Sequence, residues 1–300
     1  NCINSKWVST GGNYVSKFEK EIEKFTKAKY AVALNSGTSA LDLSLKLLGI
    51  NQDDEVLVPT ITFIAPINCV IYQKANPIFM DCDQNLNIDV DKTIKFLKEE
   101  TVFKNGYTIN KKTKKKIKAL IIVHVLGNVA NTPKLKKMCI KRNIKILEDA
   151  SESLGSFYKN KIHTGLVGNI GCLSFNANKL ITTGAGGMII TNNKKYARNA
   201  YYFSTQAKDD AFNFIHNNVG YNTRLNNLSS AVGYSQIKNI SKIIKRKKYI
   251  FEIYKKRLSN LKRIKLNSQL KDGSPNHWLI SIQLKKLTDK NKVINFLKKK

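Results

Sequence analysis

The sequence predicts an α/β fold, in which a large domain with a mostly parallel β-sheet is followed by a smaller α+β domain. Short apolar runs of strand length alternate with segments of helical periodicity through most of the chain. The pattern turns mainly helical from about residue 225, and 300 residues with 42% hydrophobic content are enough for two domains. We therefore expect a large domain over residues 1–235, beginning with an N-terminal segment (residues 1–13), and a small domain over residues 236–300.

The strands are expected where apolar runs are short and bounded by polar or glycine-containing segments. Such continuous runs are typical of strands that are covered on both faces, as in a parallel sheet. The runs are residues 30–34, 56–58, 78–80, 120–125, 144–147, 172–175 and 188–191, and a strand of the small domain is expected at residues 279–284.

The helices are expected where apolar residues recur every three or four positions. In residues 14–26, for example, Phe18, Ile22 and Phe25 share one face. The other segments are residues 38–48, 63–73, 89–99, 132–143, 193–203 and 289–300. The chain does not begin with Met and its last expected helix simply stops, so we expect a piece of a longer protein with an incomplete small domain.

The net charge of +31, from 52 basic and 21 acidic residues, is typical of proteins that bind nucleic acids. However, the lysines are spread through the chain, and the basic runs fall on helical faces. In residues 241–265 the apolar positions follow heptad spacing and leave the lysines on the opposite side; they are Ile244, Phe251, Tyr254, Leu258 and Leu261. We therefore favour solvated helix faces over a polyanion site, and we expect no specific nucleic-acid partner.

Several other classes of protein find no support. The five cysteines are far apart and form no C-x-x-C pair, which favours a reducing, cytoplasmic location over a disulfide framework or a zinc site. The four histidines show no metal-binding spacing, so each is expected to be structural and no metal site is expected. There is no apolar stretch of about 18 residues, no signal-peptide pattern, no P-loop and no G-x-S-x-G elbow. We expect no membrane association.

Small polar residues open the helix that follows the first strand, in the segment Asn-Ser-Gly-Thr-Ser-Ala (residues 35–40). Backbone N–H groups at such a helix start can bind an anion, and Ser36, Thr38 and Ser39 can add hydroxyl groups. The alternative is an ordinary N-cap, which Ser and Thr favour in any case. Taken alone, this segment favours the N-cap.

An acid and a lysine follow two later strands. Asp149 follows the strand expected at residues 144–147, where a carboxylate can hold a positively charged ring nitrogen, although a helix cap or loop acid is equally common. Lys179 lies beyond the strand that contains Ser174, before a glycine-rich turn (residues 182–187). A lysine placed there can lose its proton and act as a Schiff-base nucleophile.

Phe63 follows another strand end, where it could stack on a planar ligand; a core aromatic is the more frequent alternative. Ligands of open α/β sheets bind outside the carboxyl ends of the strands. An anion cradle, an aromatic ring, an acid and a lysine at these ends are the parts that a pyridoxal 5'-phosphate site requires.

Seven segments, in the same order, resemble the sugar aminotransferases of the DegT/DnrJ/EryC1/StrS family, which are fold type I pyridoxal-phosphate enzymes. The segments are residues 7–12, 35–41, 58–63, 148–155, 174–179, 182–187 and 219–224. Within the family, residues 153–156, 178–184 and 204–208 look most like the aminotransferases of legionaminic-acid pathways, and perosamine synthases look nearly as similar.

The resemblance implies a role for each matching residue. Lys179 would form the Schiff base and move the proton between cofactor and substrate, and Asp149 would pair with the pyridinium nitrogen. Phe63 would stack on the ring, and Asn222 would reach the cofactor phosphate of a partner subunit, so that a homodimer shares its active sites. The phosphate would be held by Gly37, Thr38, Ser39 and Ser174.

Glu152 departs from the pattern of many family members, which place Gln or His beside the ring hydroxyl of the cofactor. Acids occur there in the legionaminic and perosamine branches. A carboxylate would repel the phenolate-like ring oxygen unless one of the two keeps a proton. We therefore expect a proton to be shared between Glu152 and that oxygen.

The resemblance also implies the reaction, which moves an amino group from L-glutamate to a keto carbon, most often C4, of a nucleotide-linked keto-deoxy sugar. Such reactions serve surface-glycan or nonulosonic-acid biosynthesis, and sugar or nucleotide contacts are expected from Trp7, Thr10 and Arg224. Two alternatives remain, a sugar dehydratase of the same fold and a catalytically idle basic binding or regulatory protein. The dehydratase branch carries histidine in place of Lys179, and an idle protein would not need Lys179 and Asp149. Because family members continue beyond residue 300, we expect this chain to bind cofactor but to turn over slowly.

Overall fold

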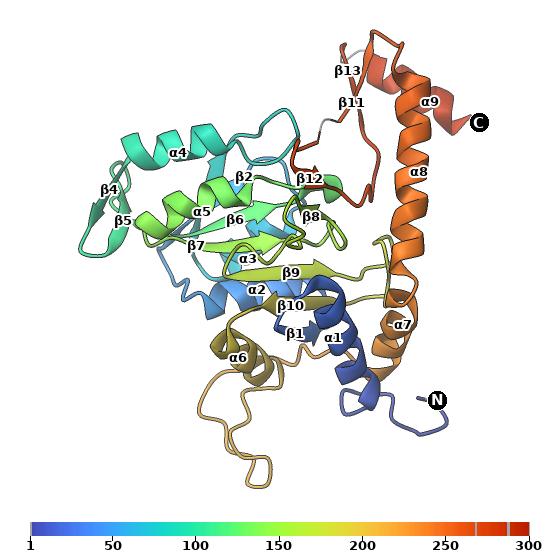
Figure 1. Ribbon diagram of the computed structural model, residues 1–300. Coiled ribbons are helices and arrows are strands. Elements are labelled where there is room, and N and C mark those ends of the chain that lie inside the picture. The colour runs from blue at the N-terminus through green and yellow to red at the C-terminus, as the bar shows by residue number, and fades with distance from the viewer. Residues whose placement is uncertain (1, 268, 287–288, 300) are drawn as a thin grey trace.

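The computed structural model describes residues 2–267, 269–286 and 289–299 (Figure 1). Among these residues a nine-stranded sheet forms the centre of the molecule, and its main path runs β1–β10–β9–β7–β6–β2–β3. The predicted α/β class is confirmed. The strands of this path are β1 (Tyr30–Leu34), β2 (Glu55–Pro59), β3 (Asn76–Met80), β6 (Lys116–Val123), β7 (Lys145–Asp149), β9 (Ile170–Ser174) and β10 (Gly187–Thr191).

The main path of the sheet is mostly parallel, as expected, with one inverted strand. Strands β3, β2, β6, β7 and β9 run parallel to one another, whereas β10 is antiparallel to both β9 and β1. The register places Gly187, at the start of β10, between Leu34 of β1 and Ser174 of β9. The start of α2, the end of β9 and the glycine-rich turn therefore meet at one edge of the sheet.

Helices cover both faces of the sheet. On one face lie α2 (Gly37–Leu47), α3 (Ala65–Tyr72) and α6 (Lys194–Ser204), and on the other lie α1 (Asn13–Thr26), α4 (Val90–Glu99), α5 (Thr132–Lys141) and α7 (Asn227–Ile237). Successive residues of one strand serve opposite faces: in β1, Val32 packs with the first group of helices and Ala33 with the second. This two-sided burial explains why the strands read as continuous apolar runs.

Two details of the sheet differ from the sequence prediction. The strand expected to reach residue 125 ends at Val123, because the chain turns into a 3-10 segment, η1 (Val125–Gly127), with a left-handed backbone at Leu126 (φ 56°). A hairpin of β4 (Thr101–Lys104) and β5 (Tyr107–Asn110), joined at Asn105–Gly106, attaches to β6 and was not predicted.

The C-terminal part rises beside the sheet on α8 (Ile240–Leu258), which leads to β11 (Ile264–Leu266), β12 (Gly273–Ser274), β13 (Ile282–Leu284) and α9 (Asp289–Lys298) (Figure 1). The heptad pattern over residues 241–265 predicted a longer helix than the structure has, because α8 ends at Leu258. Ile240 is buried, whereas Tyr254 and Leu261 are about half exposed. Strand β12 pairs with β8 (Phe157–Tyr158) and so ties this part to the large domain. The boundary at residue 236 stays a prediction.

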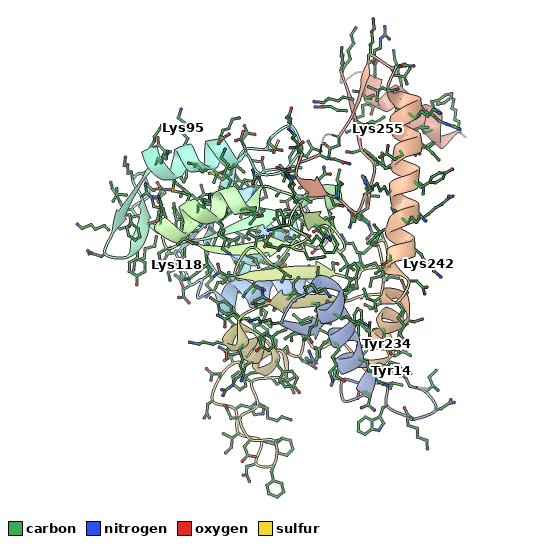
Figure 2. All side chains as sticks on the ribbon, viewed as in Figure 1. Tyr14, Lys95, Lys118, Tyr234, Lys242 and Lys255 are labelled. Atoms are coloured by element: carbon green, nitrogen blue, oxygen red, sulfur yellow. The ribbon has the colours of Figure 1, made fainter. Side chains whose placement is uncertain are left out.

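The basic side chains are scattered over the molecule. Lys95 on α4 and Lys118 on β6 lie on the left of Figure 2, whereas Lys242 and Lys255 on α8 lie on its right. This distribution supports solvated lysines over a single polyanion-binding face. None of the helices among the described residues is both long and apolar enough to cross a membrane.

Candidate active site

A cavity of about 310 Å³ opens at the carboxyl edge of the parallel strands. Its lining combines residues that follow β1, β2, β7 and β9, which the fold brings together from distant parts of the sequence. Seven of the predicted site residues line it: Gly37, Thr38, Phe63, Asp149, Glu152, Ser174 and Lys179. The cavity thus contains the predicted anion cradle, aromatic ring, acid and lysine.

The start of α2 forms one wall of the cavity. Ser36 is the N-cap, and its Oγ accepts the N–H of Ser39 at 3.0 Å, so the capping alternative is correct for this pair. Ser39 Oγ donates to Asn35 Oδ1 at 2.7 Å and does not line the cavity, whereas Gly37 and Thr38 do. Ser36 also lines the cavity, so the residue that caps α2 borders the same space as Gly37 and Thr38.

Gly37 allows the helix start to approach the end of β9. A Cβ added at Gly37 would lie 2.9 Å from Ser174 Cβ and 3.2 Å from Ser174 Oγ, distances that leave no room for a side chain. The first-turn N–H groups of α2 and the hydroxyl of Ser174 thus flank the same space. Such a space fits a phosphate group, because unpaired N–H groups at a helix start favour negative charge.

Asp149 lies at the C-terminal end of β7 and is buried. Burial raises the pKa of its carboxyl group, although hydrogen bonds from Ser151 and the charge of Lys179 act in the opposite direction. Ser151 donates its backbone N–H to Asp149 Oδ1 at 3.0 Å. A buried carboxylate of this kind is stabilised by a cationic partner, and a protonated pyridine nitrogen fits that requirement.

Lys179 and Glu152 face each other in the cavity. Lys179 Nζ lies 3.8 Å from Glu152 Oε1, and their side chains are 14% and 16% exposed. Glu152 Oε2 accepts the N–H of Leu126 at 2.7 Å, which is made possible by the turn that ends β6 early. Burial raises the pKa of the Glu152 carboxyl, against the effects of the Leu126 N–H and of Lys179.

Phe63 lines the cavity and is 71% exposed, so the alternative of a core aromatic is wrong. An exposed ring beside a cavity is available for stacking on a planar group. Phe63, the cradle at Gly37, the buried Asp149 and Lys179 together form a lining that fits pyridoxal 5'-phosphate. The role of each of these residues toward the cofactor stays a prediction.

Trp278 also lines the cavity, and the sequence analysis missed it. Its indole Nε1 donates to the carbonyl oxygen of Asn178 at 2.8 Å, and Lys179 Nζ lies 4.3 Å from the centre of its ring. Trp278 is about 100 residues away from Lys179 in sequence. No local pattern connects the two, so only the fold could identify it.

Besides Ser39, four predicted site residues lie outside this cavity within the single chain. Arg224 forms an ion pair with Glu19 at 2.8 Å and donates to the carbonyl oxygen of Ala33 at 2.9 Å. The Arg224 side chain is 8% exposed, and within the single chain its guanidinium group is paired with Glu19 and Ala33. Trp7 lines a separate hollow near the N-terminus, and Thr10 and Asn222 do not line the cavity. Contacts of these four residues with substrate or cofactor stay predictions.

The histidines are engaged in structural contacts. His124 lies 3.0 Å from Glu148 Oε2 through Nε2 and accepts the N–H of Ala130 at Nδ1, while His163 bonds to the backbone at both nitrogens. In the described ranges, no group of three or more His, Cys, Asp or Glu side chains is arranged to hold a metal ion. All five cysteines are free.

The sequence of this chain matches the DegT/DnrJ/EryC1/StrS aminotransferase family over residues 1–300. It is 34% identical over 296 residues to a GDP-perosamine synthase of Escherichia coli O157:H7, covering 99% of this chain and 76% of that protein. It is 31% identical over 251 residues to a UDP-4-amino-4,6-dideoxy-N-acetyl-beta-L-altrosamine transaminase of Campylobacter jejuni, covering 83% and 63%. The likeness to perosamine synthases is thus confirmed, while the likeness to legionaminic-acid-pathway enzymes stays a prediction.

The fold agrees with solved structures. The Helicobacter pylori aminotransferase PseC, described as involved in the biosynthesis of pseudoaminic acid, superposes with a TM-score of 0.87 at 27% identity, covering 99% of this chain and 77% of that one. The structure of a putative sugar aminotransferase from Streptococcus pneumoniae in its PLP form gives a TM-score of 0.86 at 22% identity, covering 99% and 78%. The chain has the fold of the type I pyridoxal-phosphate aminotransferases and belongs to the DegT/DnrJ/EryC1/StrS aminotransferase family.

Proposed function

We propose that this protein is a pyridoxal-phosphate-dependent aminotransferase that moves an amino group from L-glutamate to a keto carbon, C4, of a nucleotide-linked keto-deoxy sugar. The observation that carries the proposal is the placement of Lys179 beside Glu152 in a cavity that also contains buried Asp149 and the cradle at Gly37. The 34% identity to a GDP-perosamine synthase supports a nucleotide sugar as the acceptor.

Each side chain of the cavity has a distinct task in this proposal. When bound, the cofactor supplies an electron sink. Asp149 keeps the ring nitrogen protonated, and the first turn of α2 with Ser174 holds the phosphate. Lys179 binds the cofactor between turnovers, and its amine then holds and returns the proton that moves between the two reacting carbons. Phe63 covers one face of the ring.

The proposal is tested by the absorption spectrum of the purified chain with added pyridoxal 5'-phosphate, before and after L-glutamate. A yellow band that L-glutamate bleaches is expected, because the donor half-reaction leaves the cofactor in its amine form. Addition of a nucleotide-linked 4-keto sugar should restore the band, and D-glutamate is the matched control. A wild-type chain that never becomes yellow, or a band that L-glutamate leaves unchanged, would contradict the proposal.

We further propose that two chains share their active sites as a homodimer. The segment before Asn222 carries unusually exposed apolar side chains, with Phe212 at 90% and Val219 at 80% exposure, which favours cover by a second chain. Mixing an Asn222→Ala chain with a Lys179→Ala chain should then restore about a quarter to a half of wild-type activity, because one site of each mixed dimer is intact. Mixtures as inactive as the separate variants, or a monomer in sedimentation, would refute the shared site.

Replacing Glu152 by glutamine is expected to move the pH midpoint of the cofactor band downward by about one pH unit. The raised pKa of the Glu152 carboxyl indicates that this group competes for a proton, and a neutral amide would no longer oppose the anionic form of the ring oxygen. Glutamine can still accept the N–H of Leu126. Spectrophotometric titration measures the midpoint, with exposed Glu99→Gln as the control; an unchanged midpoint would count against the shared proton.

A further inference from the structure

Trp278 brings the C-terminal part of the chain into the cavity. It lies between β12 and β13, outside the sheet, yet it is 6% exposed and lines the same space as Lys179. The motifs that indicate the cofactor site all lie before residue 225, so they leave this residue without a role.

The segment that carries Trp278 is anchored on both sides. Asn276 donates from Nδ2 to the carbonyl oxygens of Glu152 and Leu154, at 2.9 Å each, and its Oδ1 accepts the N–H of Trp278 at 2.8 Å. Lys247 of α8 donates to the carbonyl oxygen of Trp278 at 3.1 Å. Trp278 is thus held against the loop that carries Glu152.

The indole group makes two contacts with the segment of Lys179. Its N–H is bonded to the carbonyl oxygen of Asn178, which fixes the backbone next to the lysine. Its ring lies over Lys179 Nζ, and the face of an indole ring attracts a cation strongly when the pair is shielded from water. Glu152 Oε1, at 3.8 Å from Nζ, is too distant for a hydrogen bond. The ring, at 4.3 Å from its centre to Nζ, and the charge of Glu152 therefore both restrict the flexible lysine side chain.

We propose that Trp278 is a positioning residue for Lys179, which holds the amine between the indole ring and Glu152, where it can react with the aldehyde carbon of the cofactor. This inference rests on the proposed function, because it assigns Trp278 to the step in which Lys179 captures pyridoxal 5'-phosphate. In that step the ammonium group of Lys179 first gives a proton to water, the neutral amine adds to the carbonyl carbon, and a water molecule leaves, so no further reactant is needed. Trp278 does not take part in the bonds that form or break.

The test measures two properties separately: the rate at which Lys179 forms its covalent bond to pyridoxal 5'-phosphate, and the affinity of the cavity for the cofactor without that bond. Pyridoxal 5'-phosphate needs Lys179 to give its yellow band, whereas pyridoxamine 5'-phosphate binds without a covalent bond. Trp278→Met keeps a flexible apolar side chain, smaller than the indole, without an aromatic ring, and Trp278→Phe keeps a ring but loses the N–H group. The control is Tyr249→Met, since the exposed ring of Tyr249 on α8 also has a cation, Arg246, over its face but lies outside the cavity.

We expect Trp278→Met to slow the appearance of the band about tenfold, with Trp278→Phe restoring the rate to within about threefold of wild type. The dissociation constant of pyridoxamine 5'-phosphate, measured by calorimetry, should change by less than about threefold in both variants. If the Met variant does not fold, as judged by its thermal melt, Trp278→Leu takes its place.

Two results would overturn the inference. One is an unchanged rate of band formation in the variant without a ring. The other is an equal loss of affinity for both forms of the cofactor, because a merely structural role of Trp278 would produce that result. A wild-type chain that forms no band would instead refute the proposed function, and the inference with it, so the two failures are distinguishable.

Discussion

Replacement of Lys179 by alanine is expected to remove the yellow band completely and to lower amino transfer by at least about 10⁴-fold. Lys179 is the side chain that brings an amine into the cavity, and only an amine can form a Schiff base with the cofactor aldehyde. Glu152, whose Oε1 lies 3.8 Å from Lys179 Nζ, is an acid with a raised pKa and cannot form that bond. Loss of the amine removes both the covalent anchor and the group that moves the proton. Absorption spectra and single-turnover rates with L-glutamate measure the two losses separately.

Matched variants make this result specific to the position of Lys179. Lys242→Ala, on the exposed side of α8, removes the same group elsewhere and should leave spectrum and rate unchanged. Lys179→Arg keeps the positive charge but not the nucleophile, so it should behave like Lys179→Ala. A yellow band in Lys179→Ala that L-glutamate still bleaches would show that another amine captures the cofactor, and the assignment of Lys179 would be lost.

The sequence could predict those site residues that lie in short local sequence patterns. Each of Gly37, Asp149 and Lys179 follows a strand that reads as a short apolar run, and in a parallel sheet such strand ends converge at one edge. Their convergence in one cavity therefore needed no knowledge of side-chain packing. The same logic explains why the strand and helix order was correct through most of the large domain.

The parts that escaped prediction depend on long-range contacts. Trp278 reaches Lys179 only because β12 pairs with β8 and Asn276 bonds to the loop of Glu152. The ion pair of Arg224 with Glu19, which lies 205 residues away in sequence on α1, was also not predicted, while the substrate contact of Arg224 stays a prediction. By contrast, the hairpin of β4 and β5 did carry a local signal, the Asn105–Gly106 turn, which is typical of tight hairpins.

Replacement of Asp149 by asparagine is expected to change activity and stability in opposite directions. Amino transfer should fall about 10²–10³-fold, the magnitude typical of removing one electrostatic stabiliser, because an amide cannot keep the ring nitrogen protonated. The cofactor-free chain should melt at a higher temperature than wild type at about pH 7, since asparagine can still accept the N–H of Ser151 without burying a charge.

The sign of the stability effect follows from the pKa of Asp149, which burial raises above the ordinary value of 3.8. Because the fold disfavours the ionised carboxyl, Asp149 contributes its full stability below that ordinary value and loses it as the pH rises through the raised pKa. The advantage of Asp149→Asn should therefore be larger at about pH 7 than at about pH 4.5, whereas exposed Asp91→Asn should show no such trend. Added pyridoxal 5'-phosphate should reduce or reverse the difference in melting temperature between Asp149→Asn and wild type, because a cationic ring nitrogen stabilises the ionised carboxyl group of the wild type. If the variant melts below wild type without cofactor at every pH, Asp149 stabilises the fold by itself, and the argument that its charge awaits a cationic partner fails.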